Sequence, residues 1–257
     1  MADGAKRKGG RTYRYLDIKS DMNSDLPPTL LRHMAEGTLR SERMVHGDRV
    51  LWVKRPEKLS GRMRWQKGDP GRSFRDEKAG YLRLLENRAP VTALVAIGDD
   101  FYAMEDSGAS LREHLWSPPE NPDIAVIVDD AASALGRLHA LGLVHGRPAM
   151  KDICWKDGQV TFIDFERTLR AAPGIKGQTQ DVIIFFFSLF SDGAARNLAE
   201  GAREAYIAES GHEVYDHARR LMRRFRWLQA AMSPVFPLLK DKRDFAAIAP
   251  LFDFFLR

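Results

Sequence analysis

The 257-residue sequence contains a single cysteine, Cys154, which excludes a disulfide-bonded scaffold and makes a reducing compartment the simpler expectation. It has no long hydrophobic run either. The longest, residues 182–190, has about half the length of a membrane-spanning helix, so we interpret it as a buried helix. The basic N-terminus is not followed by an apolar segment, which excludes a secretory signal peptide. These absences predict a soluble, cytoplasmic protein whose contact with a membrane is peripheral at most.

The composition is that of a folded protein. Hydrophobic residues make up 44% of the chain, and its 14 Phe and 5 Trp must be buried somewhere, so global disorder is excluded. Lys and Arg number 40 against 35 Asp and Glu, a net charge of +5. This surplus suits an anionic partner such as a nucleotide, an acidic lipid or a nucleic acid, and it selects none of them.

Strand patterns are gathered in the first 105 residues, and helical patterns dominate the rest. Strands are predicted at 49–54, 91–97 and 101–104, with a helix at 74–86 between them. Further helices are predicted at 124–141 and from 180 onward, separated by a hairpin whose turn is 156–159. We therefore predict an α+β fold with a flexible basic arm (1–28), a β-rich lobe (29–106) and a helical lobe (107–257).

Residues 138–166 resemble the catalytic segment of the protein-kinase-like fold. A helix ending in Leu-His-x-x-Gly is followed by Val-His-Gly, a hairpin and Ile-Asp-Phe-Glu. The Ile-Asp-Phe-Glu form is closest to the bacterial lipopolysaccharide core (Kdo and heptose) kinases, the RIO kinases and the small-molecule phosphotransferases. The resemblance covers roughly residues 37–190. It implies a bilobal fold, ATP and Mg²⁺ as cofactors, and phosphoryl transfer to the hydroxyl of a glycolipid or protein acceptor.

The resemblance also assigns roles in nucleotide binding. Lys54 ends a strand, as the phosphate-binding lysine of these kinases does, and shares a strand face with apolar residues. Glu77 is its implied ion-pair partner, preferred over Asp76 because apolar residues follow it at helical spacing. Glu105 begins the implied hinge between the lobes.

The implied metal ligands are Asp164, in Ile-Asp-Phe-Glu, and Asp152, which replaces the usual asparagine seven residues after His145. Carboxylate oxygens are hard ligands that suit Mg²⁺. Asp181 corresponds to the buried aspartate that supports the catalytic loop. His145 is interpreted as structural, and neither His nor Cys shows the spacing of a zinc site.

Arg147 stands where these kinases carry the catalytic aspartate, and arginine cannot accept a proton. Three interpretations follow. The chain is a pseudokinase; or it is an atypical kinase in which Arg147 stabilises phosphoryl charge; or Arg147 has a packing role, paired with an acidic residue such as Asp181. A Gly-x-Gly-x-x-Gly motif is also missing, since residues 35–41, the only place for it, contain one glycine.

A basic helix is predicted near the C-terminus, with Arg219, Arg220, Arg223, Arg224 and Arg226 beside an apolar stripe of Ala218, Leu221, Met222, Phe225 and Leu228. It is interpreted either as a packed helix with a solvated basic face or as a contact for an anionic membrane or phosphorylated glycolipid. A nucleic-acid partner is not predicted, because aromatic residues are not interleaved with the basic ones.

Overall fold

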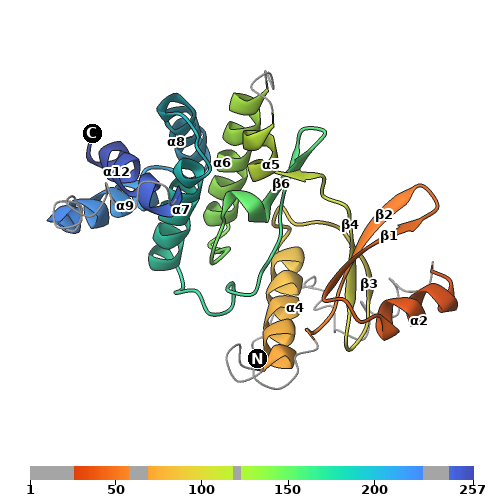
Figure 1. Ribbon diagram of the computed structural model, residues 1–257. Helices are drawn as coiled ribbons and strands as arrows, with labels where there is room; N and C mark the ends of the chain where they lie inside the picture. Colours follow the sequence, from red (N-terminus) through yellow and green to blue (C-terminus); the bar gives the residue numbers. More distant parts are fainter. Residues whose placement is uncertain (1–25, 58–68, 118–122, 228–242) are drawn as a thin grey trace, which may run out of the picture. The chain divides into compact units, whose positions relative to one another are not determined.

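The computed structural model describes residues 26–57, 69–117, 123–227 and 243–257, and the chain divides into two compact units (Figure 1). Unit 1 consists of residues 1–60 and 93–106, and unit 2 of residues 61–92 and 107–257, each as far as it is described. Unit 1 contains an antiparallel sheet and unit 2 is mainly helical. This confirms the α+β fold class.

The sheet of unit 1 has the strand order β1-β2-β4-β3, formed by β1 (Ser41–His46), β2 (Arg49–Lys54), β3 (Leu94–Ile97) and β4 (Tyr102–Glu105). Each neighbouring pair is antiparallel. On β2, Leu51 and Val53 are buried in the core, and the alternate face with Trp52 and Lys54 is half-buried. The face that Lys54 shares with apolar residues is therefore not the core face of the sheet.

An unpredicted helix, α2 (Pro28–Glu36), packs on this sheet. Arg55, just after β2, is only 4% exposed. Its Nε donates to the carbonyl of Met34 at 2.5 Å, and its Nη1 pairs with Glu42 at 2.7 Å. Leu26 is also buried in this core, so packing begins within the predicted arm; its residues 1–25 lie outside the described residues.

The helices of unit 2 are α4 (Pro70–Glu86), α5 (Leu111–Trp116), α6 (Ile124–Ala140), α7 (Ile175–Ser191), α8 (Arg196–Ser210), α9 (Glu213–Arg224) and α12 (Arg243–Leu256). α6 packs against α8, and α7 packs against α9 and α12 (Figure 1). The predicted buried helix is confirmed, because Val182, Phe185 and Phe186 of α7 are buried. No helix in the described ranges is long and apolar enough to cross a bilayer.

Helix α4 belongs to unit 2, whereas we predicted it in the β-rich lobe. The ring of Tyr81 stacks on that of Phe165 at 5.6 Å, and its hydroxyl donates to the carbonyl of Thr92 at 2.6 Å. Gly80 permits the close approach, since a Cβ there would lie 3.0 Å from the carbonyl oxygen of Phe165. The helix also starts earlier than predicted, because Asp69 caps it and Pro70 suits its first turn.

A second, three-stranded sheet lies in unit 2, with the order β5-β6-β7: β5 (Ala109–Ser110), β6 (Ile153–Lys156) and β7 (Gln159–Phe162). The predicted hairpin is confirmed, and both residues of its turn, Asp157 and Gly158, have positive φ. A 3₁₀ turn, η1 (Met150–Asp152), leads into β6. This hairpin places Asp152 at its start and Asp164 just beyond its end.

Candidate active site

The loop after α6 is fixed by a buried aspartate, as the sequence predicted. Asp181 of α7 is fully buried and accepts hydrogen bonds from the backbone N–H groups of His145 and Gly146, at 2.7 and 2.9 Å. Its Oδ2 also lies 3.4 Å from Nε2 of His139. Gly146 has a φ of 97°, and a Cβ there would lie 2.8 Å from the backbone of Arg167. Only glycine suits this position.

His145 is a structural residue in a neutral state. Its Nε2 lies 3.1 Å from the carbonyl oxygen of Ile163, and its Nδ1 lies 3.3 Å from the N–H of Arg147. The carbonyl requires a donor and the N–H requires an acceptor, so the neutral tautomer protonated at Nε2 satisfies both contacts. Burial lowers the pKa of His145, although Asp181 and Asp164 act in the opposite direction. The imidazole thereby joins the loop to the segment that carries Asp164.

The two predicted metal ligands lie on adjoining backbone segments. The N–H of Ile163 donates to the carbonyl of Asp152 at 3.0 Å. Asp164, the next residue, has a φ of 65°, a left-handed conformation that aspartate tolerates better than most residues. Uncommon backbone conformations of this kind cluster at functional sites.

Arg147 connects the two carboxylates. Its Nη2 lies 2.7 Å from Oδ2 of Asp164 and 3.3 Å from Oδ2 of Asp152. The predicted alternative of a pairing with Asp181 is wrong, because Asp181 is occupied by the backbone of the loop. The Arg147 side chain is 32% exposed, so this contact with the carboxylates is partly accessible to solvent.

Asp152 is a buried carboxylate whose hydrogen bonds are incomplete. Its side chain is 5% exposed, and within the described residues its Oδ2 has no hydrogen-bond donor, because the contact with Arg147 lacks hydrogen-bond geometry. Lys151, which the sequence analysis did not single out, lies 3.5 Å from Oδ1. Burial and the neighbouring Asp164 raise the pKa of Asp152 to about 6, against the effect of Lys151 and Arg147.

These side chains are compatible with a magnesium ion that binds together with a nucleotide. The described residues contain no group of three or more His, Cys, Asp or Glu able to form a complete metal cage. Mg²⁺ is usually bound by one or two carboxylates and completes its coordination with phosphates and water. The unsatisfied Oδ2 of Asp152, beside Oδ2 of Asp164, supplies such a pair of ligands.

The predicted nucleotide-binding residues are divided between the units. Lys54 and Glu105 belong to unit 1, where Glu105 ends β4 and pairs with Arg49 at 2.8 Å. Glu77 belongs to unit 2, where it is 3% exposed on α4. The ion pair of Lys54 with Glu77 and the hinge role of Glu105 stay predictions.

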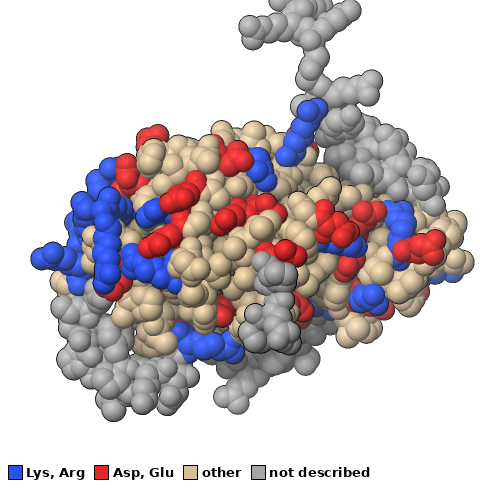
Figure 2. Space-filling view, turned by 90° about the horizontal axis from the view of Figure 1, so that it is seen from above, with Lys and Arg blue, Asp and Glu red and all other residues tan. Residues whose placement is uncertain are grey.

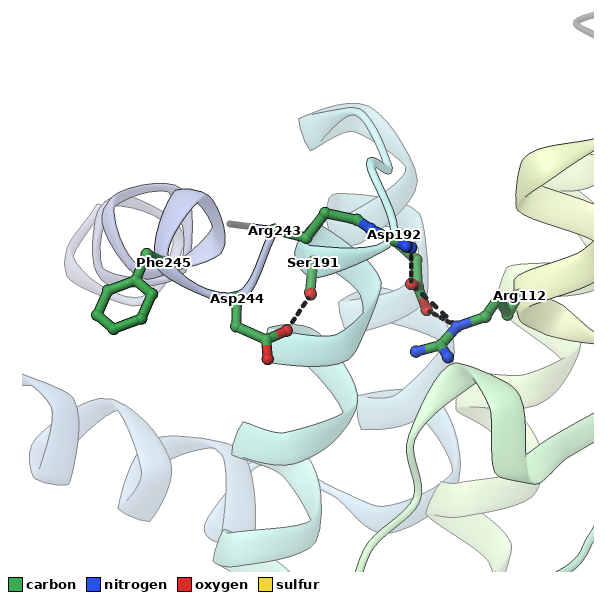
Figure 3. A pocket seen from close by; sticks show the side chains of 6 residues that line it. All are labelled: Arg112, Ser191, Asp192, Arg243, Asp244 and Phe245. Carbon is green, nitrogen blue, oxygen red and sulfur yellow. Dashed lines mark hydrogen bonds and ion pairs between the residues drawn. The ribbon is translucent and has the colours of Figure 1, made fainter. Parts of the chain in front are cut away.

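Unit 2 also contains a pocket of about 340 Å³ that the sequence analysis did not predict (Figure 3). It is lined by Arg112, Ser191, Asp192, Arg243, Asp244 and Phe245. The Asp192 side chain is 1% exposed, and both of its oxygens lie 3.0 Å from Nε of Arg112. The guanidinium carbons of Arg112 and Arg243 lie 5.2 and 4.4 Å from the ring centre of Trp116. These contacts link α5, α7 and α12.

Comparison with known proteins gives a relative that covers most of the chain. Over 209 residues the chain is 32% identical to an uncharacterized protein of Haemophilus influenzae, covering 80% of this chain and 85% of that protein. The chain belongs to the family of this protein. No family model matches the sequence.

Solved structures with a similar fold include two kinases. One is WaaP in complex with acyl carrier protein, with a TM-score of 0.48 and 20% identity over 86% of this chain and 96% of WaaP. The other is a divergent kinase without a glycine-rich loop that regulates membrane ultrastructure of the Toxoplasma parasitophorous vacuole. Its TM-score is 0.46, with 17% identity over 77% of this chain and 86% of that one.

Proposed function

We propose that the chain is a phosphotransferase of the kinase-like fold that moves the γ-phosphoryl group of ATP to a hydroxyl group. The observation that carries the proposal is that two carboxylates contact the same guanidinium group, that of Arg147. Asp152 and Asp164 each place an oxygen within 3.3 Å of the same nitrogen of Arg147, and one of these oxygens is buried without a hydrogen-bond donor. A site of this kind binds positive charge.

In this proposal Asp152 and Asp164 hold Mg²⁺, which neutralises phosphate charge when bound. Lys54 binds the nucleotide phosphates, Glu77 orients Lys54, and Glu105 lies at the hinge beside the nucleotide. Arg147 cannot act as a base, and its fixed positive charge stabilises the transferred phosphoryl group instead. A loose transition state makes little demand on a base, so the missing aspartate is compatible with transfer.

The acceptor in this proposal is a sugar hydroxyl of the lipopolysaccharide core, with a protein hydroxyl as the other class. The reaction takes place in the cytoplasm, where ATP is available, with the acceptor at the inner face of the membrane. The support is the resemblance of the Ile-Asp-Phe-Glu segment to the lipopolysaccharide core kinases.

A pseudokinase is the second candidate, and the contacts of Arg147 favour it. The guanidinium already neutralises both carboxylates at 2.7 and 3.3 Å, as a metal would. A chain that keeps this arrangement would work through nucleotide binding or protein contact without phosphoryl transfer.

A transfer assay separates the two candidates. The full chain is incubated with γ-³²P-labelled ATP, Mg²⁺ and dephosphorylated lipopolysaccharide core. Incorporation of label that is lost in Asp164→Asn supports the phosphotransferase. Asp157→Asn is the matched control, because it removes an exposed carboxylate of the same hairpin that also has a positive φ.

A thermal shift measurement covers the remaining outcomes. Stabilisation by Mg²⁺ and ATP without incorporation of label supports the pseudokinase. The absence of both stabilisation and incorporation contradicts the phosphotransferase and a pseudokinase that binds nucleotide.

A further inference from the structure

Helix α9 presents a row of arginines on the side opposite to its packed face. Its buried residues are Val214, Tyr215, Ala218 and Met222. Arg220, Arg223 and Arg224 are exposed on the other side, and Arg226 is exposed just beyond the helix end. Arg219 is half-buried and donates to the backbone carbonyl of Arg257 at 3.1 Å. Figure 2 shows Lys and Arg side chains gathered at its left end, the side on which α9 and α12 lie in Figure 1.

These arginines are not neutralised by nearby acids. Within the described residues, no ion pair joins Arg220, Arg223 or Arg224 to a carboxylate, and the same holds for Arg226. The sequence contains no Asp or Glu between Asp216 and Asp241. Some exposed arginines elsewhere in unit 2 are paired, for example Arg137 with Glu209 at 2.9 Å. Among the described residues, the row therefore concentrates positive charge that no ion pair offsets.

Two large aromatic side chains lie exposed within the same segment. We predicted that Phe225 continues the packed stripe of the helix, and this is wrong: Phe225 is 38% exposed, and Trp227 is 60% exposed. The helix ends at Arg224, and the N–H of Phe225 turns back to the carbonyls of Leu221 and Met222. The chain thus leaves the core after Met222. Arginine and aromatic residues are interleaved at positions 223–227, which corrects the sequence-based statement that they are not.

We propose that this Arg–aromatic surface (Arg220, Arg223, Arg224, Phe225, Arg226 and Trp227) binds the surface of a membrane that contains anionic phospholipids. Phosphate headgroups pair with guanidinium groups, and the interfacial region accommodates indole and phenyl rings. One bilayer surface therefore satisfies both kinds of side chain, whereas an acidic protein would need a matching apolar pocket for Trp227. The inference does not depend on phosphoryl transfer.

Vesicle binding of the full chain tests the proposal. We expect flotation with phosphatidylcholine vesicles that contain 30% phosphatidylglycerol, and about fivefold weaker binding for each arginine removed. The double variant Arg223→Gln/Arg224→Gln should then bind roughly 25-fold more weakly. The matched control is Arg72→Gln/Arg75→Gln, which removes the same charge from exposed positions on α4. All variants keep the basic N-terminal residues, so their contribution is constant.

Fluorescence of Trp227 gives a second readout that uses the folded wild-type chain. We expect quenching by brominated phospholipids in anionic vesicles and its loss in Trp227→Phe. Equal binding to neutral and anionic vesicles would overturn the proposal, as would an equal loss in the α4 control. Tighter binding to polyglutamate or to DNA than to anionic vesicles would overturn it in favour of an acidic protein or a nucleic acid.

Discussion

Removing the guanidinium of Arg147 should increase the affinity of the site for a divalent cation. Nη2 of Arg147 lies 2.7 Å from Asp164 and 3.3 Å from Asp152, so a metal that uses the same oxygens must displace it. A charge-assisted contact contributes about 1.5–3 kcal/mol, and the 32% exposure of the arginine favours the lower part of that range. Since 1.4 kcal/mol corresponds to a factor of ten, we expect Arg147→Ala to bind Mn²⁺ about 10–40 times more tightly.

The assay is a titration of the protein with Mn²⁺ alone. Binding is measured by calorimetry and by the paramagnetic resonance signal of the free ion. Arg167→Ala is the matched control, because Arg167 is an exposed arginine near the same loop and has no described contact with either carboxylate. Its affinity should change by less than about threefold, as expected for a screened surface charge. Arg147→Gln keeps most of the side-chain volume and serves where the alanine variant does not fold.

The reasoning is refuted if Arg147→Ala binds Mn²⁺ no more tightly than the wild type, or if Arg167→Ala gains as much affinity. Either result would mean that Arg147 does not specifically compete with the metal at the carboxylate oxygens. The outcome is distinct from that of the transfer assay. A wild-type chain that transfers phosphate shows that Arg147 yields to the metal, and one that gains metal binding only after the substitution is a pseudokinase.

Three further results are expected. Because burial lowers the pKa of His145, the unfolded chain takes up a proton there below about pH 6.5 that the folded chain does not. This group alone should lower the stability as the pH falls below that value, whereas the raised pKa of Asp152, about 6, acts in the opposite direction below that pH. In urea titrations between pH 5 and 8, His145→Gln should therefore be more stable relative to the wild type at pH 5 than at pH 8. Asp192→Ala should lower the free energy of unfolding by about 2–4 kcal/mol, because it leaves Arg112 without its buried partner, and Asp192→Asn should cost less. Gly146→Ala should cost about 2–4 kcal/mol in the same measurement, whereas Gly158→Asn, also at positive φ but with free space around it, should cost less than about 1 kcal/mol.

Much of the fold could be predicted because its elements carry local signals. The β6–β7 hairpin has a turn of two residues with positive φ, and α6 has a continuous apolar face. Helix α2 was missed because Pro27 and Pro28 suggested an irregular lead-in, although proline is favoured in a first helical turn. The start of α7 was placed five residues too late, because its first turn is polar in sequence. Gln178 is buried there through hydrogen bonds to the carbonyls of His139 and Leu143, which lie far away in the sequence.

The residues of the candidate site could be predicted from the sequence, but the ion pairs between Arg147 and the carboxylates could not. The motif around His145 and Asp164 identified the two carboxylates. Comparison with the kinases that the sequence resembles also showed that Arg147 replaces their catalytic aspartate. Which acid Arg147 contacts depends on how the loop lies against the hairpin, and sequence spacing does not encode that geometry. For the same reason the buried role of Arg55 was missed, because its partners Met34 and Glu42 come from other elements.

The backbone around Arg147 indicates that its position is a property of the fold and not of one flexible side chain. Asp181 accepts hydrogen bonds from the N–H groups of His145 and Gly146, the two residues before Arg147. The neutral His145 ring accepts from the N–H of Arg147 and donates to the carbonyl of Ile163. Ile163 in turn donates to the backbone of Asp152 and precedes Asp164 directly. Arginine and carboxylates therefore share one hydrogen-bonded frame, and a cation that enters the site has to move only the guanidinium. This makes Arg147 the residue whose replacement separates an enzyme from a pseudokinase most directly.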